Sequence, residues 1–397
     1  MKKISVHQWM SLSSLFLLGP MLRLLPRAAV VQAGRAAWLC ALPALPLLLV
    51  YARFLADFWQ ARSAGEGLGE ASLSILGPKL GRGLLFFYAL WLLLYGGFVL
   101  RCMADRLVVT VYPHSAPGFF TLSMGLCCLV AALGSARSLA RTAKLLIPPV
   151  FGILLLLLLV SLKGLEKDNV LPVTLYDLPG LTRAAVPVLD VLGLGLFLPL
   201  FFLGFVEKPE RSLLAPYSRW LLGESALLTL LVFAVAGSLG AEIVGTLSLP
   251  FFTLVRNLVF FRSLERIEAL VVACWIFPDF LLASLCFFAG QYCVRLALGE
   301  KPLLDRGGRL DFGHLRWLIP FCVLAATGAG LLLAPDLQSL RRLSERIVPV
   351  LNLVVCYLSV PLLRLAQLRC GKKAAQPGET RPLTPQAGKG FLRSHRQ

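Results

Sequence analysis

The sequence predicts an all-α integral membrane protein of about ten transmembrane helices, and three observations support this. Of the 397 residues, 57% are hydrophobic and only 15% are charged, whereas soluble domains have about 45–50% apolar and about 25% charged residues. The mean hydropathy is +0.77. Apolar runs of about 20 residues, long enough to cross roughly 30 Å of hydrocarbon, recur along the chain.

The net charge of +18 does not indicate nucleic-acid binding, because lysines and arginines occur in short clusters between the apolar runs. Loop clusters of this kind suit contact with anionic lipid headgroups. We therefore expect a lipid bilayer, and no nucleic acid, as a partner.

Neither cofactor nor catalytic chemistry is indicated. Most of the ten cysteines lie inside apolar runs, where cysteine behaves as a small hydrophobe, and no C-x-x-C spacing occurs. The four histidines are far apart, so no metal site is expected. The motifs H-E-x-x-H and G-x-S-x-G are missing, and "GEGLGE" at 65–70 lacks the third glycine of the dinucleotide fingerprint. We expect a protein that is not an enzyme.

One membrane domain over residues 1–369 accounts for all the apolar runs. The ten expected spans lie near residues 9–31, 36–56, 84–104, 117–135, 143–162, 185–205, 217–240, 267–294, 317–334 and 346–366. The connection 241–266 carries the apolar stretch "LSLPFFTLV", which predicts a re-entrant or surface helix. The polar tail 370–397 is rich in Gly and Pro and is predicted to be disordered.

The first span has a second interpretation. "MKK" followed by "SLSSLFLLGPML" resembles a secretory signal with cleavage after Ala33, although Arg23 and Arg27 interrupt the run. Read as a span, it starts in the cytoplasm, because basic residues then concentrate on the inner segments. An even number of spans places the C-terminus there too.

Glycine and proline predict breaks in two spans. Gly19 and Pro20 interrupt the first span, and Gly193 and Gly195 lie in the sixth. Such residues can unwind a membrane helix where protein or water satisfies the freed backbone groups. Spans one and six are equivalent in a five-plus-five inverted repeat, so we expect a LeuT-like fold with broken helices one and six. Against this, both residue types are common in membrane helices and also interrupt spans two and five.

A ligand site is expected between spans one, three, six and eight, with Tyr95 and Gly96 facing a cavity. Three ionisable side chains at membrane depth are its candidates: Arg23, Asp190 and Asp279. A charge inside a membrane needs a partner, and we expect Arg23 to pair with Asp190. The alternative is that Arg23 extends to the interface and Asp190 caps its helix.

Several segments together resemble a known family. They are "KISVHQW" at the N-terminus, "AVVQAGRAAWL" at 29–39, "FFTLVRNLVFF" at 251–261 and "LERIEAL" before the span that contains Trp275. In this order and spacing they resemble the spore germination permease family, the B subunits of GerA-type germinant receptors, within the amino acid–polyamine–organocation superfamily. The resemblance covers residues 2–369.

The resemblance implies a receptor subunit in the spore inner membrane. It would sense a small-molecule germinant, often an amino acid, and act with a larger A subunit and a lipoprotein C subunit. The chain departs from the family in its first span, where Gly19 and Pro26 fit the pattern "G-x-G-I-L-x-L-P" but Pro20 and Arg23 do not. Its sixth span lacks the acid of the family's "F-G-E"-like break.

Four charges precede the eighth span, within "RSLERIEALVVACWIF" at 262–277. Arg262 and Glu265, and Glu265 and Glu268, are three residues apart, and Arg262 and Arg266 are four apart, so they share a helix face. We expect this face to contact the A subunit or an extracellular gate. The alternative is a solvated helix start, where acids are favoured.

The function remains open between a ligand-sensing receptor subunit and a secondary amino acid transporter coupled to H⁺ or Na⁺, with a structural membrane scaffold as a third possibility. A transporter needs a coupling-ion site, and only Asp190 and Asp279 are available for one inside the spans.

Overall fold

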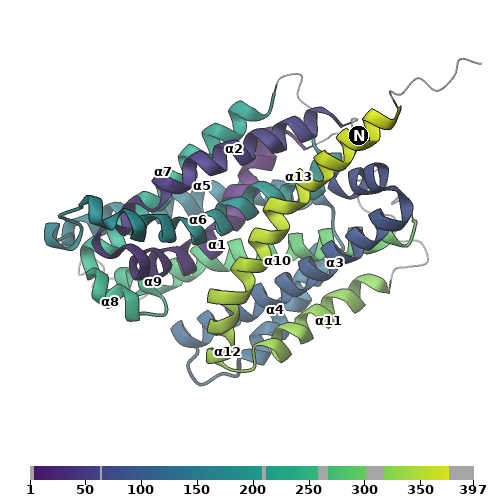
Figure 1. The fold of residues 1–397 in the computed structure, drawn as a ribbon. Coiled ribbons are helices and arrows are strands. Elements are labelled where there is room, and N and C mark those ends of the chain that lie inside the picture. Colours follow the sequence, from purple (N-terminus) through teal and green to yellow (C-terminus); the bar gives the residue numbers. More distant parts are fainter. Residues whose placement is uncertain (1–3, 63–64, 208–211, 258–266, 301–316, 375–397) are drawn as a thin grey trace, which may run out of the picture.

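The computed structural model describes residues 4–62, 65–207, 212–257, 267–300 and 317–374, and these form a bundle of helices (Figure 1). Over these residues no β-strand is formed, and Ile4 and Val206 make an isolated bridge. Eight helices in this part of the chain are long and apolar enough to cross a membrane. The prediction of an all-α integral membrane protein is confirmed.

Each of the ten expected spans overlaps a long apolar helix. These helices are α1 (Val6–Ala33), α2 (Ala41–Gln60), α3 (Leu68–Thr110), α4 (Pro117–Ala132), α5 (Ala136–Ser161), α6 (Leu178–Phe197), α7 (Leu214–Leu239), α10 (Ile267–Ala297), α11 (Leu318–Leu333) and α13 (Val348–Ala374). Helices α4 and α11 have 16 residues each, which at about 1.5 Å per residue is shorter than the roughly 30 Å hydrocarbon layer.

Shorter elements connect the long helices. The 3₁₀ helix η1 (Gly34–Leu39) joins α1 to α2, and η5 (Leu198–Phe205) continues α6. Helices α8 (Ala241–Thr246) and α9 (Pro250–Arg256) follow α7. Helix α9 lies in the stretch "LSLPFFTLV", for which a re-entrant or surface helix was predicted, and most of its apolar side chains are buried. Before α13 come α12 (Leu337–Arg342) and the π-helical turn η8 (Leu343–Ile347).

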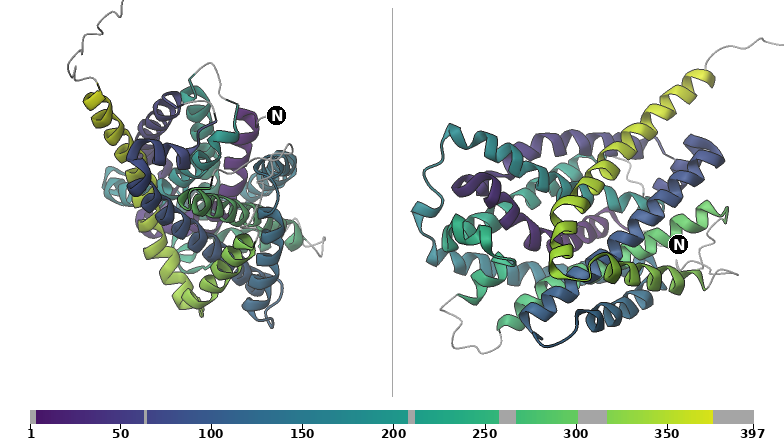
Figure 2. Two further views of the ribbon diagram at one scale, coloured as in Figure 1. Left: turned by 90° about the vertical axis from the view of Figure 1, so that its right-hand side faces the viewer. Right: turned by 60° about the horizontal axis from the view of Figure 1, so that its bottom comes forward.

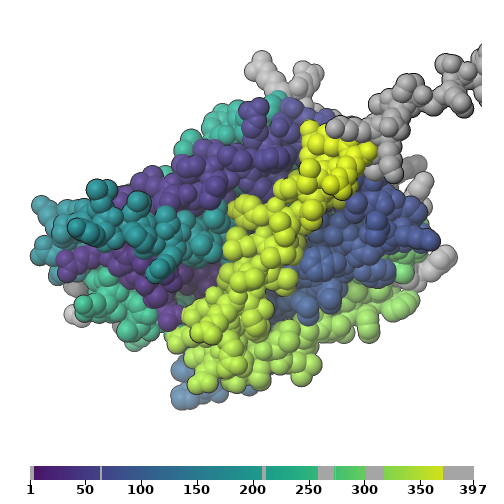
Figure 3. All heavy atoms as spheres, viewed as in Figure 1, coloured from purple at the N-terminus to yellow at the C-terminus, as the bar shows by residue number. Residues whose placement is uncertain are grey.

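The core lies around α1, α6 and α10. Helix α1 packs against α5, α6, α7 and α10, and α3 lies along α10. Helix α13 instead crosses one face of the bundle diagonally, against α2, α3 and α6 (Figures 1 and 3). Its C-terminal end extends past the rest of the bundle (Figure 2).

The predicted break in the first span is wrong. Helix α1 runs without interruption through Gly19 and Pro20. Proline removes only one backbone donor, and dense packing against α5, α6 and α10 supports the helix on several sides. In the sixth span Gly193 and Gly195 lie inside α6, and the change from α to 3₁₀ geometry comes at Leu198 instead. The five-plus-five inverted repeat stays a prediction.

Some predictions fall on parts of the chain outside the described residues. This is the case for Arg262, Glu265 and Arg266, and for the side chain of Glu268, whose backbone lies in α10. The tail from residue 375 is also outside them. Helix α13 reaches Ala374, so residues 370–374 are helical rather than part of a disordered tail.

Candidate functional site

Arg23 points from α1 toward the start of α13. Its Nη1 donates a hydrogen bond to Ser344 Oγ at 2.8 Å, and its guanidinium carbon lies 5.4 Å from the centre of the Phe98 ring. Within the described residues no hydrogen bond or ion pair joins it to Asp190, although the two charges are close enough to interact electrostatically. The predicted partner is therefore near Arg23 but does not bind it.

Asp190 is buried in α6 with an exposed fraction of 4%. Its Oδ1 has no hydrogen-bond partner in the part of the chain that the structure describes. The neighbour of its carboxyl group is the Asn352 amide of α13, and Asn352 Oδ1 in turn accepts a hydrogen bond from Trp91 Nε1 at 3.0 Å. Trp91 thus holds Asn352 beside Asp190 and leaves one carboxyl oxygen available.

Tyr95 lies close to both charges, since it interacts electrostatically with Asp190 and with Arg23. Its ring is stacked on Trp91, with centroids 6.1 Å apart and an interplanar angle of 13°. Arg23, Tyr95 and Asp190 therefore lie near one another, from α1, α3 and α6. We call these three residues, with Asn352, the central polar cluster.

Asp279 belongs to a different cluster. It forms a buried ion pair with Arg106 of α3, with side-chain exposed fractions of 3% and 2%. The Arg106 guanidinium also lies 5.7 Å from the centre of the Trp275 ring. Gly19 of α1 lies in close contact with Asp279, and a Cβ at position 19 would collide with Asp279 Oδ1. An acid paired in this way is less suited to bind a ligand than the open carboxyl of Asp190.

Sequence reasoning missed Arg106, because the third span was expected to end at residue 104, whereas α3 continues to Thr110. The overlooked signal was the run of charges at its end. Arg101 is also buried; its Nε donates to Ala334 O at 2.9 Å, and its Nη1 lies 3.7 Å from Asp105 Oδ1, one helical turn away. The spacing of Arg101 and Asp105 is that of a helical pair.

The glycines predicted to shape the site serve helix packing. A Cβ on Gly96 would lie 2.7 Å from the Phe287 ring of α10, and one on Gly193 would lie 2.6 Å from the Tyr357 hydroxyl of α13. A Cβ on Gly195 would collide with Leu17 of α1. These positions bring neighbouring helices into close contact with α3 and α6.

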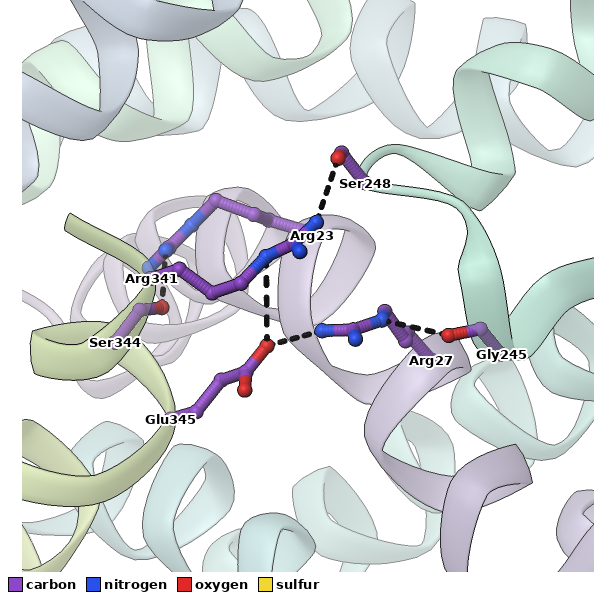
Figure 4. A network of polar contacts seen from close by, with 7 residues as sticks. All are labelled: Arg23, Arg27, Gly245, Ser248, Arg341, Ser344 and Glu345. Carbon is purple, nitrogen blue, oxygen red and sulfur yellow. Dashed lines mark hydrogen bonds and ion pairs between the residues drawn. The ribbon is translucent and has the colours of Figure 1, made fainter. Parts of the chain in front are cut away.

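A network of polar contacts surrounds the C-terminal half of α1 (Figure 4). Arg27 forms an ion pair with Glu345, and its Nε donates to Gly245 O at 3.0 Å. Arg341 donates to Ser248 Oγ at 2.9 Å. Because Glu345 and Ser344 both lie in η8, this π-helical turn holds α1 through Arg27 and Arg23. Single π turns within helices often occur at functional sites.

No group of three metal-ligating side chains exists among the residues described. A groove of about 590 Å³ lies between α2 and α7, lined mainly by apolar residues, and contains none of the predicted site residues.

The chain matches the family described as "Spore germination protein" over residues 3–301. The matched region includes Arg23, Tyr95 and Asp190, whereas Ser344 and Asn352 come from the part of the chain that follows it. No curated protein matches the chain.

Proposed function

As a member of the spore germination protein family, the chain is a germination-related membrane protein, and we propose that it is the membrane subunit of a nutrient-germinant receptor that senses an amino acid. In this proposal it resides in the spore inner membrane with both termini in the cytoplasm. It acts with an A subunit and a lipoprotein C subunit, and its role is binding rather than catalysis.

The open carboxyl oxygen of Asp190 carries this proposal. A buried carboxyl group in a membrane protein normally has a partner, yet Asp190 Oδ1 has none in the described structure. An ammonium group would supply that partner. Arg23, which interacts with the same region, suits a carboxylate, because guanidinium groups bind carboxylates with two parallel hydrogen bonds. The two charges together fit the zwitterion of an amino acid.

Binding to the purified protein tests the proposal. We expect one or more amino acids to raise the melting temperature of the protein in detergent. In Asp190→Asn and in Arg23→Gln, the amino acid concentration needed for the same rise should be at least ten times higher. Glu242→Gln is the control, because Glu242 is an exposed acid on α8. Unchanged binding in both cluster variants would contradict the assignment of the site.

The alternative is a secondary amino acid transporter coupled to H⁺ or Na⁺. It is favoured by the same open carboxyl group, which could take up a proton or sodium ion instead of an ammonium group. Uptake into proteoliposomes separates the two functions. A transporter accumulates labelled amino acid when a proton or sodium gradient is imposed, whereas a receptor subunit binds it without accumulation.

A further inference from the structure

A second buried acid lies away from the central polar cluster. Glu224 is near the middle of α7 and has an exposed fraction of 4%. Its Oε2 has no hydrogen-bond partner among the described residues. Glu224 lies inside the seventh expected span, so Asp190 and Asp279 are not the only acids within the spans. The proposed receptor function does not use it.

Helix α1 supplies the polar neighbour of Glu224. The Ser14 hydroxyl lies within hydrogen-bonding reach of the Glu224 carboxyl group. Ser14 Oγ also accepts a hydrogen bond from Trp220 Nε1 at 2.9 Å, and Trp220 lies one turn before Glu224 on α7. The indole therefore holds the serine, and the serine faces the acid, across the contact between α1 and α7.

Glu224 forms no ion pair with a described residue, and its Oε2 has no hydrogen-bond partner among them. The helices that pack on α7 are α1, α2, α5, α6, α8 and α9, with the 3₁₀ turns η1, η2 (Leu162–Gly164) and η3 (Lys167–Asn169). Other charged, histidine and tyrosine side chains on these elements and on α7 are described, and none of them forms an ion pair with Glu224. They are His7, Arg23, Arg27, Arg35, Tyr51, Arg53, Asp57, Arg137, Arg141, Lys144, Lys163, Lys167, Asp168, Arg183, Asp190, Tyr217, Arg219, Glu242 and Arg256.

An ionised carboxylate at this position would be buried without a counter-ion, which is strongly unfavourable. A neutral carboxylic acid has one O–H donor and can use it on Ser14 Oγ, which has two acceptor lone pairs. Trp220 occupies one of them and the acid can occupy the other. Ser14 can also donate its own O–H to an ionised carboxylate, so it can bond to either form of Glu224. Burial without a counter-ion is what favours the protonated form.

We propose that Glu224 is a proton-binding site inside the membrane, holding its proton against Ser14 while α1 lies against α7. When the two helices separate, water enters, the O–H bond breaks and the proton passes to water. Closing the contact takes a proton up again. This site is independent of which small molecule the protein senses.

The position of Ser14 on α1 links the proposed proton site mechanically to the central polar cluster. Arg23 follows Ser14 by nine residues on the unbroken helix α1, about 14 Å at about 1.5 Å per residue. A movement of α1 that opens the contact with Glu224 would therefore also displace Arg23. Proton release and occupancy of the cluster would be linked through one helix.

Infrared spectroscopy of the purified protein tests the proton directly. At neutral pH the wild type should show the carbonyl band of a protonated carboxylic acid, and Glu224→Gln, a neutral side chain of the same shape, should lose it. Asp190→Asn distinguishes the other buried acid, and Glu242→Gln is the exposed control. The band should shift in Ser14→Ala. A band that Glu224→Gln leaves intact, or one that Ser14→Ala does not shift, would overturn the proposal.

Hydrogen–deuterium exchange tests the link to helix contact. After correction for intrinsic rates, raising the pH should lower the protection of peptides from α1 and α7 in the wild type and leave it unchanged in Glu224→Gln. The same pH dependence in both proteins would overturn the link between the proton and the α1–α7 contact.

Discussion

At the scale of single residues, Arg106 and Asp279 illustrate how this protein accommodates charge in its core. Each is almost fully buried, and each neutralises the other across α3 and α10. Removal of one partner leaves an uncompensated charge, which costs about 3–5 kcal/mol in buried pairs.

We therefore expect Arg106→Met and Asp279→Leu each to lower the melting temperature strongly in detergent. The double replacement should be less harmful than the sum of the two single changes, because it removes both charges. Arg219→Gln, at an exposed site on α7, is the control and should have little effect. Single variants as stable as the control would show that the pair is not formed.

Glu224 predicts a pH dependence whose sign follows from proton linkage. In the proposed site the folded protein keeps a proton on Glu224, whereas an unfolded glutamate releases it above about pH 4.3. The native state then binds more protons than the unfolded state, so stability falls as the pH rises, by up to about 1.4 kcal/mol per unit over the range in which only the folded state is protonated.

Melting curves of the wild type and Glu224→Gln between pH 5 and pH 8 measure this dependence. The slope of melting temperature against pH should be shallower in the variant. The contributions of the other titratable groups cancel in the difference between the wild-type and variant curves. Parallel curves would mean that Glu224 is already ionised in the folded protein.

The central polar cluster shows how far the sequence predicts single residues. Arg23 and Asp190 were identifiable because a charge inside an apolar run is conspicuous, whereas Tyr95 was selected as a residue of the third span expected to face a cavity. The hydrogen-bond partner of Arg23 was not, because Ser344 lies 321 positions away in the chain and serine is common. Glu224 was missed although it carries the same signal as Asp190, a single acid inside an expected span.

At the scale of elements, Gly19 sets how closely α1 approaches α10. We expect Gly19→Ala to lower stability by about 1–3 kcal/mol, as overpacking does, because its methyl group would collide with Asp279. Gly152→Ala is the matched control, since Gly152 lies in α5 with no atom near its Cβ position. There alanine should be neutral or slightly stabilising. Equal effects at both sites, measured as melting temperatures, would contradict this packing.

The contact between α1 and η8 predicts a charge-swap result. Arg27→Glu and Glu345→Arg should each weaken the attachment of α1, and the double swap should restore part of it. Because the pair is partly exposed, the coupling should be small, about 0.2–1 kcal/mol. A double-mutant cycle on melting temperature measures it. Purely additive effects would show that the two side chains do not interact.

The ten helices were predictable because hydropathy is a local property of about 20 residues. The ends of the helices and their bends were less predictable. Helix α3 begins at Leu68 rather than near residue 84, with a kink at Gly77, whose φ of 74° is readily adopted only by glycine. The predicted break at Gly19 failed because a glycine in a membrane helix can serve close packing instead.

At the scale of the whole molecule, the site draws on both ends of the chain. The family match ends at residue 301, yet α13 supplies Asn352 to the central polar cluster, and η8 supplies Ser344, the hydrogen-bond partner of Arg23. Helix α13 lies across the face of the bundle rather than within it (Figure 3), so its movement would change the surroundings of Asp190 and Arg23 together. Such long-range assembly cannot be predicted from local patterns.

Germination of spores that lack the gene tests the central claim most directly. The strain should also lack any other gene of the same family, so that no relative substitutes for it. We expect the spores to form normally and to resist heat, yet to keep their refractility and heat resistance when given at least one nutrient that germinates the parent. Restoring the wild-type gene should restore the response. Spores that germinate like the parent on every nutrient would contradict a role in germinant sensing.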